Sequence, residues 1–172
     1  AAHSVADLDE LYRRIHAIIG GLINADNFYI ALYDEDTGLL SFPYFIDEFD
    51  IAPPPKKPER GLTEYVLRSG QPLLTSPEVY RRLVDTGAIE AVGAPSIDWL
   101  GAPLKVKEQT IGVMALQTYT PEVRYTPSDQ DMLGFISTQV ASAIQSKRAE
   151  EQIRKLNSTL HSISQVSQIL VR

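Results

Sequence analysis

The sequence predicts an α+β domain, in which one central antiparallel β-sheet carries the terminal helices on one face and short helices and loops over the other. Apolar residues recur at alternating spacings of three and four near both ends of the chain, which is the pattern of amphipathic helices. Two pairs of apolar segments are each joined by a short turn, which predicts antiparallel hairpins. Because the long helical patterns stand at the chain ends, we expect them to pack together on one side of the sheet.

The composition argues against several classes of function. The chain has 172 residues, 44% of them hydrophobic, and a formal net charge of −6, so nucleic-acid phosphates would be repelled rather than bound. It contains no cysteine, which removes disulfides, thiolate catalysis, thiol-linked chromophores and cysteine metal sites. No apolar run approaches the ~18 residues of a membrane span and no signal peptide opens the chain, so we expect a cytoplasmic protein without direct membrane contact.

The first elements are a helix and a hairpin. The apolar stripe of the helix has three-four spacing, Asp7 and Glu10 stand in the capping-box relation at its start, and residues 24–27 end it. The members of this stripe are Leu8, Leu11, Ile15, Ile18 and Leu22. Residues 27–34 and 39–46 are rich in aromatic and apolar residues and flank a Gly-containing turn, which predicts the first hairpin.

The middle of the chain predicts short elements over one face of the sheet. Residues 47–60 contain four prolines, which remove backbone donors, so this tract is a surface loop. A two-turn helix follows and is closed by Gly70, a short strand covers residues 72–75, and Ser76 followed by Pro77 opens another short helix that ends at Gly87.

The second hairpin, Ser96 to Tyr119, predicts the middle of the sheet. Its second strand is apolar on both faces, as expected only for a strand covered on both sides. One face carries Ile111, Val113 and Ala115, and the other carries Gly112, Met114 and Leu116.

A very long helix begins at Pro127, capped by Thr126 and Asp129, and runs without a stop signal to the end of the chain. Its apolar register changes along the way. The first stripe is Ile136, Val140 and Ala143, and the second is Ile153, Leu156, Leu160, Ile163 and Leu170. We therefore divide the chain into a domain, 1–145, and an outgoing signalling helix, 146–172, whose coiled-coil-like seam predicts a parallel homodimer. Because the chain begins without Met and stops within this pattern, we interpret it as part of a longer protein.

Few residues carry reactive chemistry. The histidines, His3, His16 and His161, have no second ligand at helical spacing, and the turn at 34–38 lacks the later acidic ligands of a calcium loop, so we expect no metal site. We find no arrangement of nucleophile, base and orienting residue, and we expect no enzyme and no catalytic residues. Asp47, Glu48 and Asp50 border the proline-rich loop and could bind a cation or a cationic ligand, but a solvated acidic rim is the default expectation. Arg60 stands at a helix start with Thr63, an arrangement that favours an anion, although Gly61 could serve only to let the loop enter the helix.

Four motifs in this order resemble those of a GAF domain. They are "GLTEYVLRSGQPLL", "WLGAPL", "IGVMALQTY" and "YTPSDQDMLGFISTQVASAIQ", within a match from about Leu8 to Gln145. The resemblance implies a central antiparallel sheet with terminal helices on one face and a ligand cavity on the other. It also implies a small-molecule sensing and dimerisation module of a bacterial signalling protein, such as a sensor histidine kinase of a two-component system or a cyclic-di-GMP enzyme.

The signatures of better-known GAF subtypes are not present. The cyclic-nucleotide-binding pattern is broken, because no Asn-Lys pair precedes Phe42 and the spacing to Asp47 and Glu48 differs. Bilin and haem binding need a Cys or a suitably placed His, and the methionine-sulfoxide-reducing members act through cysteines, which this chain lacks. The ligand and any cofactor are therefore undefined by the sequence.

Two functions fit these features. In the first, an unidentified small molecule fills the cavity and changes the strain on the long helix, which leads to a covalently linked kinase, cyclase or phosphodiesterase. In the second, the domain is a ligand-free structural module for dimerisation and relay. For the sensor, we predict a ligand that is anionic or has a carbonyl-rich edge. The predicted ligand-binding residues are Tyr44, Arg60, Thr63, Trp99 and Met114.

Overall fold

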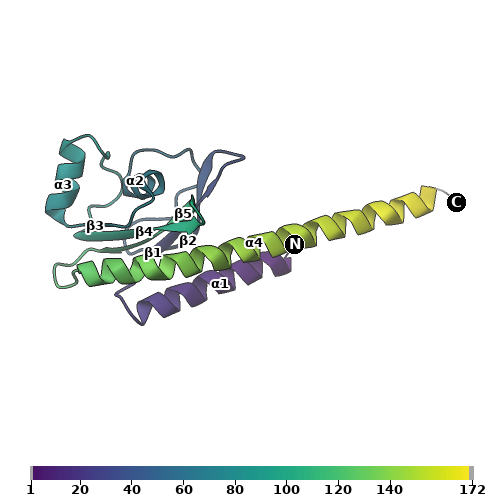
Figure 1. Ribbon diagram of the computed structural model, residues 1–172, viewed down its shortest axis with the longest axis horizontal. Coiled ribbons are helices and arrows are strands. Elements are labelled where there is room, and N and C mark those ends of the chain that lie inside the picture. The colour runs from purple at the N-terminus through teal and green to yellow at the C-terminus, as the bar shows by residue number, and fades with distance from the viewer. Residues whose placement is uncertain (1, 171–172) are drawn as a thin grey trace.

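The computed structural model describes residues 2–170, with the side chains of residues 7–169, and has the predicted α+β architecture (Figure 1). Helices α1 and α4 lie along one face of the sheet, α2 and α3 lie over the other, and the C-terminal part of α4 extends beyond the domain. In chain order the elements are α1 (Ala2–Gly20), β1 (Asn27–Asp34), β2 (Leu39–Ile46), α2 (Leu62–Ser69), β3 (Leu73–Thr75), α3 (Pro77–Asp85), β4 (Asp98–Val106), β5 (Gln109–Thr118) and α4 (Pro127–Leu170).

The sheet has five strands in the order β2-β1-β5-β4-β3, and every neighbouring pair is antiparallel. Both predicted hairpins are confirmed, and the second of them contributes β5, the central strand. Lys107 makes the tight turn between β4 and β5 with a positive φ of 56°. The proline-rich tract is a loop that touches the sheet edge through one bridge, between Leu40 and Lys56.

The main core lies between the sheet and the two terminal helices. Side chains of alternate residues of β1, β4 and β5 meet the buried face of α1 and α4 there. The fully buried members include Ile19, Phe28, Ile30, Leu100, Leu104, Met114, Leu116, Leu133 and Ile144. A second, smaller cluster lies on the opposite face and contains Tyr29, Val66, Trp99, Val113 and Ala115. The expectation that β5 is covered on both faces is thus confirmed.

The first helix differs from the prediction in its start and in its buried face. It begins at Ala2, so Asp7 lies inside the helix, where it forms ion pairs with Lys147 and Arg154 of α4 at 3.5 and 3.7 Å. Ile18 and Leu22, which we expected in the buried stripe, are 61% and 55% exposed. The helix buries Tyr12, Ile15 and Ile19 instead, and Ile23 is buried just beyond its end. It carries two neighbouring apolar stripes that share Ile15, and contact with α4 and the sheet decides which one is covered.

The predicted helix ends are largely confirmed. Gly70 closes α2 with a left-handed φ of 61°, and the Ser76 hydroxyl accepts a hydrogen bond from the Val79 N–H at the start of α3. Thr126 and Asp129 cap α4 reciprocally, with N–H to side-chain distances of 2.7 and 3.2 Å. Within α4, Val140 is buried and Ile136 partly buried as expected, but Ala143 is exposed. The buried stripe instead contains Leu133, Ser137, Ala141 and Ile144.

The close contact between β5 and β1 gives a test of this packing. A Cβ added to Gly112 would lie 2.2 Å from the Ala31 carbonyl oxygen, a backbone atom that cannot move aside without shifting β1. We expect Gly112→Ala to lower the free energy of unfolding by about 1–3 kcal/mol or more, measured by urea denaturation. Gly134→Ala is the control, because its nearest contact is 3.4 Å from Pro72 and α4 should gain about 0.5–1 kcal/mol of helix propensity. Equal stability of Gly112→Ala and the parent chain would contradict the packing.

Candidate functional site

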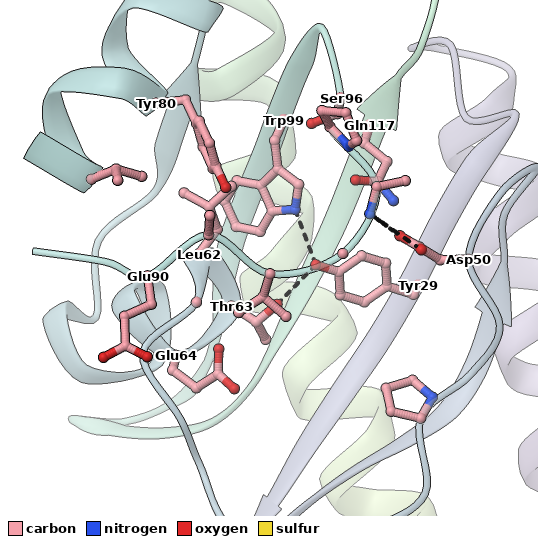
Figure 2. Close-up of a pocket in the computed structure, with 18 of the residues that line it drawn as sticks. Tyr29, Asp50, Leu62, Thr63, Glu64, Tyr80, Glu90, Ser96, Trp99 and Gln117 are labelled. Atoms are coloured by element: carbon pink, nitrogen blue, oxygen red, sulfur yellow. Dashed lines mark hydrogen bonds between the residues drawn. The ribbon is translucent and has the colours of Figure 1, made fainter.

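A cavity of about 590 Å³ lies on the sheet face opposite the terminal helices (Figure 2). Strands β1, β2, β4 and β5 form its floor, α2 and α3 form two walls, and the loops at 47–61 and 90–96 form the remaining walls. The lining includes Tyr29, Phe42, Phe45, Asp50, Ile51, Leu62, Thr63, Glu64, Tyr80, Arg81, Val84, Glu90, Val92, Ser96, Trp99 and Gln117. Aromatic and aliphatic side chains with a few polar groups are the usual lining of a small-molecule site.

The indole of Trp99 forms part of the floor because the strand makes room for it. A Cβ on Gly101, two residues along β4, would lie 2.1 Å from an atom of the Trp99 ring. Glycine at this position therefore lets the ring lie flat along the strand. Trp99 is 2% exposed and faces the cavity together with Gln117, its partner across the β4–β5 ladder.

Three of the polar side chains at the cavity floor form hydrogen bonds with one another. The Trp99 indole N–H donates to the Tyr29 hydroxyl at 3.0 Å, and the Tyr29 and Thr63 hydroxyls lie 2.8 Å apart. Burial raises the pKa of Tyr29 to about 12, so the phenol stays protonated at neutral pH and can donate in this chain of hydrogen bonds. The network joins β1, β4 and α2, as the dashed lines in Figure 2 show.

A carboxylate joins the two loops that border the cavity. Asp50, from the proline-rich loop, accepts from the backbone N–H of Ala94 in the loop at 90–96, with distances of 3.2 and 3.3 Å to its two oxygens. The contact needs a glycine, because Gly93 has a φ of 79° and its added Cβ would lie 3.1 Å from the Asp50 carboxylate. The two loops are therefore coupled at the border of the cavity, and both contribute lining residues.

The acidic rim predicted at 47–50 is not a free cation-binding group. Asp47 accepts hydrogen bonds from the Tyr119 hydroxyl at 2.9 Å, from the Gln117 amide and from two backbone N–H groups of its own loop. Glu48 accepts from the Asn27 amide at 3.0 Å. Burial, with the hydrogen bond to Asp47, raises the pKa of Tyr119 above its ordinary value. Among the described residues, no cluster of histidine and carboxylate side chains has the arrangement of a metal site.

The structure brings together two of the five predicted ligand-binding residues. Thr63 and Trp99 both line the cavity and belong to the same hydrogen-bond network. Tyr44 and Met114 point to the opposite face of the sheet, where Tyr44 lies 2.8 Å from the His16 ring nitrogen and Met114 is fully buried in the main core. Successive side chains of a strand point to opposite faces, so an error of one residue in the assignment of Tyr44 or Met114 reverses the face.

Arg60 also lies outside the cavity. Its guanidinium donates to the Gly87 carbonyl oxygen, lies 3.8 Å from the Glu90 carboxylate, and lines a separate shallow hollow with Tyr65 and Arg68. The first turn of α2 presents Glu64 to the cavity instead. Arg60, on which our expectation of an anionic ligand partly depended, is therefore not among the residues that line the cavity.

Several lining residues were not predicted. Tyr29 was assigned only to a strand, although it stands one residue from the equally apolar Phe28, and a single sequence does not say which of the two faces the cavity. Glu64 was not singled out in the sequence, yet it is 4% exposed. Its place in the first turn of α2 gave no signal of burial, because exposed acids are also favoured there by the helix dipole. Tyr80, Glu90 and Gln117 gave no comparable signal.

The fold and the cavity together define an α+β domain with a cavity on one sheet face and terminal helices on the other. The chain belongs to the GAF domain family, whose model matches residues 5–145. No curated protein sequence matches it. The recognition made from the four motifs is thus confirmed.

Solved structures of GAF domains from signalling proteins resemble this one. The GAF-B domain of DevS from Mycobacterium smegmatis has a TM-score of 0.63 at 14% identity, with 84% of this chain and 98% of that chain covered. A domain of a putative two-component sensor histidine kinase from Sinorhizobium meliloti has a TM-score of 0.53 at 23% identity, covering 85% and 96%. A type II free methionine-R-sulfoxide reductase from Thermoplasma acidophilum, an enzyme, has a TM-score of 0.60 at 12% identity, covering 80% and 94%. At these identities the likeness is one of fold.

The hydrogen-bond network at the cavity floor gives the second test. Tyr29→Phe leaves the buried indole N–H of Trp99 without its acceptor, so we expect a loss of about 1–3 kcal/mol in the free energy of unfolding, measured by urea denaturation. Tyr80→Phe is the control, because it removes a hydroxyl from the same cavity lining that takes part in no hydrogen bond within the described residues. We expect it to change stability by less than about 0.5 kcal/mol. Equal losses in the two variants would contradict the role of the network.

Proposed function

We propose that this GAF domain is a small-molecule sensing module that passes a ligand-dependent change through α4 to a covalently linked output domain. The observation that carries the proposal is the cavity beside the central hairpin. Its volume, about 590 Å³, lies within the range of about 300–1,000 Å³ that is common for small-molecule sites. Its lining combines five aromatic side chains with buried polar groups that can orient a ligand.

The β4–β5 hairpin supplies a physical route from the cavity to α4. Trp99 and Gln117 face the cavity, while their chain neighbours Leu100 and Leu116 are fully buried in the core shared with α1 and α4. A ligand that moves the hairpin by a fraction of an ångström changes the packing on both faces, because close-packed cores do not deform independently.

A second connection leads to the start of α4. The carboxylate of Asp98, which precedes Trp99, accepts from the Arg124 side chain at 3.0 Å and from the Tyr125 backbone N–H at 2.9 Å. Tyr125 is followed by Thr126, the cap of α4. A change at the cavity floor therefore has a short path of hydrogen bonds to the first turn of the outgoing helix.

The outgoing helix favours a parallel homodimer. Ile153, Leu156, Leu160 and Ile163 lie on one stripe of α4 and are 57–63% exposed, while Leu170 lies outside the residues whose side chains are described. Each such side chain leaves about 1.5–3 kcal/mol of burial unused. A second copy of the same helix covers the stripe most directly, and a parallel arrangement delivers both C-termini to one output. The proposed parts are thus the sensor domain, 1–145, and the signalling helix, 146–172.

The second candidate function is a ligand-free module for dimerisation and relay. One observation favours it, because Tyr29, Thr63 and Trp99 already satisfy one another and need no ligand to do so. Both candidates are non-enzymatic, cytoplasmic parts of a signalling protein that bind no nucleic acid. The signalling proteins among the fold neighbours support the signalling role alone. None of the helices in the described part of the chain is long and apolar enough to cross a membrane.

The sensor hypothesis is tested with a thermal-shift screen of metabolites and nucleotides. A ligand present at a hundred times its Kd adds about 2.7 kcal/mol to the apparent stability of the native state. The single tryptophan lies at the cavity floor, so a true ligand should also change its fluorescence. Val84→Phe, which narrows the cavity, should abolish both signals, whereas Val79→Phe adds the same volume on α3 outside the lining and should preserve them. A broad screen without any such ligand would favour the ligand-free module.

The dimer contact is tested by analytical ultracentrifugation of this chain beside a chain ending at Gln145. We expect the longer chain to dimerise at tens of micromolar and the shorter one to remain largely monomeric, because only the longer one carries the exposed apolar stripe. Leu156→Glu should shift the longer chain toward monomer, and Ser158→Glu, on another face of α4, should not. Equal association of the two chains, or two monomers, would contradict the proposed contact.

A further inference from the structure

We propose that the cavity takes a ligand with an aromatic or alkyl body and a cationic nitrogen, and that the Glu64 carboxylate binds the nitrogen. This inference rests on the proposed sensing function and names the ligand class of the same site. It depends on the burial of Glu64, on the charges around it and on the aromatic lining.

Glu64 is a buried residue, and one of its two carboxylate oxygens accepts no hydrogen bond. It is 4% exposed and lines the cavity. Its Oε1 accepts a hydrogen bond from the Glu59 N–H at 3.3 Å, whereas Oε2 accepts none and the carboxylate has no ion pair within the described part of the chain. Oε2 also lies beside the backbone of Gly61, 2.9 Å from the place of an added Cβ. Oε2 is not among the described side-chain atoms that are both fully buried and without a partner, so it remains accessible from the cavity that Glu64 lines, where a cationic group can pair with the carboxylate.

The cations of the lining do not replace the missing partner. The Lys56 ammonium is 2.6 Å from the Glu59 carboxylate, so its charge is already paired. Arg81 stands on an exposed position of α3. The other acids of the lining are also accounted for, because Asp50 accepts from Ala94 and Glu90 is exposed beside Arg60. Glu64 is therefore the one buried charge of the described lining, and it is negative.

The position of Glu64 also disfavours an anion. It stands in the first turn of α2, so the negative charge that the helix dipole favours there is already supplied by Glu64 itself. Its own side chain folds back over the start of the helix, as the hydrogen bond from Glu59 and the contact with Gly61 require. A ligand carboxylate or phosphate approaching this helix start would meet the Glu64 carboxylate first.

The aromatic residues supply surfaces suited to the same ligand. Tyr29, Phe42, Phe45, Tyr80 and Trp99 all line the cavity, and Tyr29 stacks on Phe45 with ring centroids 5.1 Å apart. Aromatic faces attract cations as well as apolar groups. Glu64, Tyr29 and Trp99, which Figure 2 labels, all line this cavity. One ligand can therefore contact the rings with its body and Glu64 with its nitrogen.

The test uses three probes with one body and three head charges: phenethylammonium, 2-phenylethanol and phenylacetate. Binding is followed by the Trp99 indole N–H resonance in ¹H–¹⁵N spectra, which is unique because the chain has one tryptophan. We expect phenethylammonium to bind at least tenfold more tightly than either other probe. A preference for phenylacetate, equal affinity for the alcohol, or no binding of the cation at millimolar concentration would overturn the proposal.

The variants Glu64→Gln and Glu108→Gln separate the local contact from the net charge. Each removes one negative charge, but Glu108 is exposed in the turn between β4 and β5, away from the cavity. We expect Glu64→Gln to weaken phenethylammonium at least tenfold and leave 2-phenylethanol within about twofold, and Glu108→Gln to change neither. Equal effects of the two variants would overturn the proposal. A neutral or anionic metabolite found at the cavity in the broad screen would refute the ligand class alone, whereas a screen without ligands would refute the sensing function as well.

Discussion

The burial of the β4–β5 hairpin on both faces is the constraint on which the rest of the domain depends. A sheet strand with apolar residues on both sides needs a cover on each. The terminal helices cover one face with a continuous core that includes Leu100, Met114 and Leu116. The other face is covered only in part, by α2, α3 and two loops, and the space that remains is the cavity. The same hairpin thus forms part of the cavity floor and also packs against α4.

The incomplete cover is maintained by polar contacts together with the small apolar cluster that includes Val66 of α2. Trp99, Tyr29 and Thr63 connect two strands with α2, and Asp50 connects the two loops at the border. Such bonds are short-range and directional, so they can hold a wall in place without filling the space beside it. A ligand that competes for them, or adds contacts between them, alters elements that are adjacent to the core of α4.

The elements that the sequence predicted well are those with local signals. The bounds of β1 and β2 agree with the prediction because Gly38 and the proline-rich tract interrupt the pattern on either side. The ends of α2, α3 and α4 are set by Gly70, Ser76 and Thr126, whose roles depend on neighbouring residues alone. The buried face of α1 was predicted incorrectly for Ile18, because an exposed and a buried apolar stripe look alike until a partner covers one of them.

The sequence by itself determined the family, the order of the elements and the presence of a sheet covered on both faces, since each follows from local pattern and motif. Only the tertiary structure decided which members of each strand face the cavity, because a difference of one residue reverses the side and both sides are apolar. Trp99 therefore lines the cavity while Met114 and Tyr44 do not. The tertiary structure also decided which charged residues line the cavity. Glu64 is buried there, whereas Arg60 bonds to a carbonyl outside it. The sequence does not show this, because burial depends on segments that are distant in the chain.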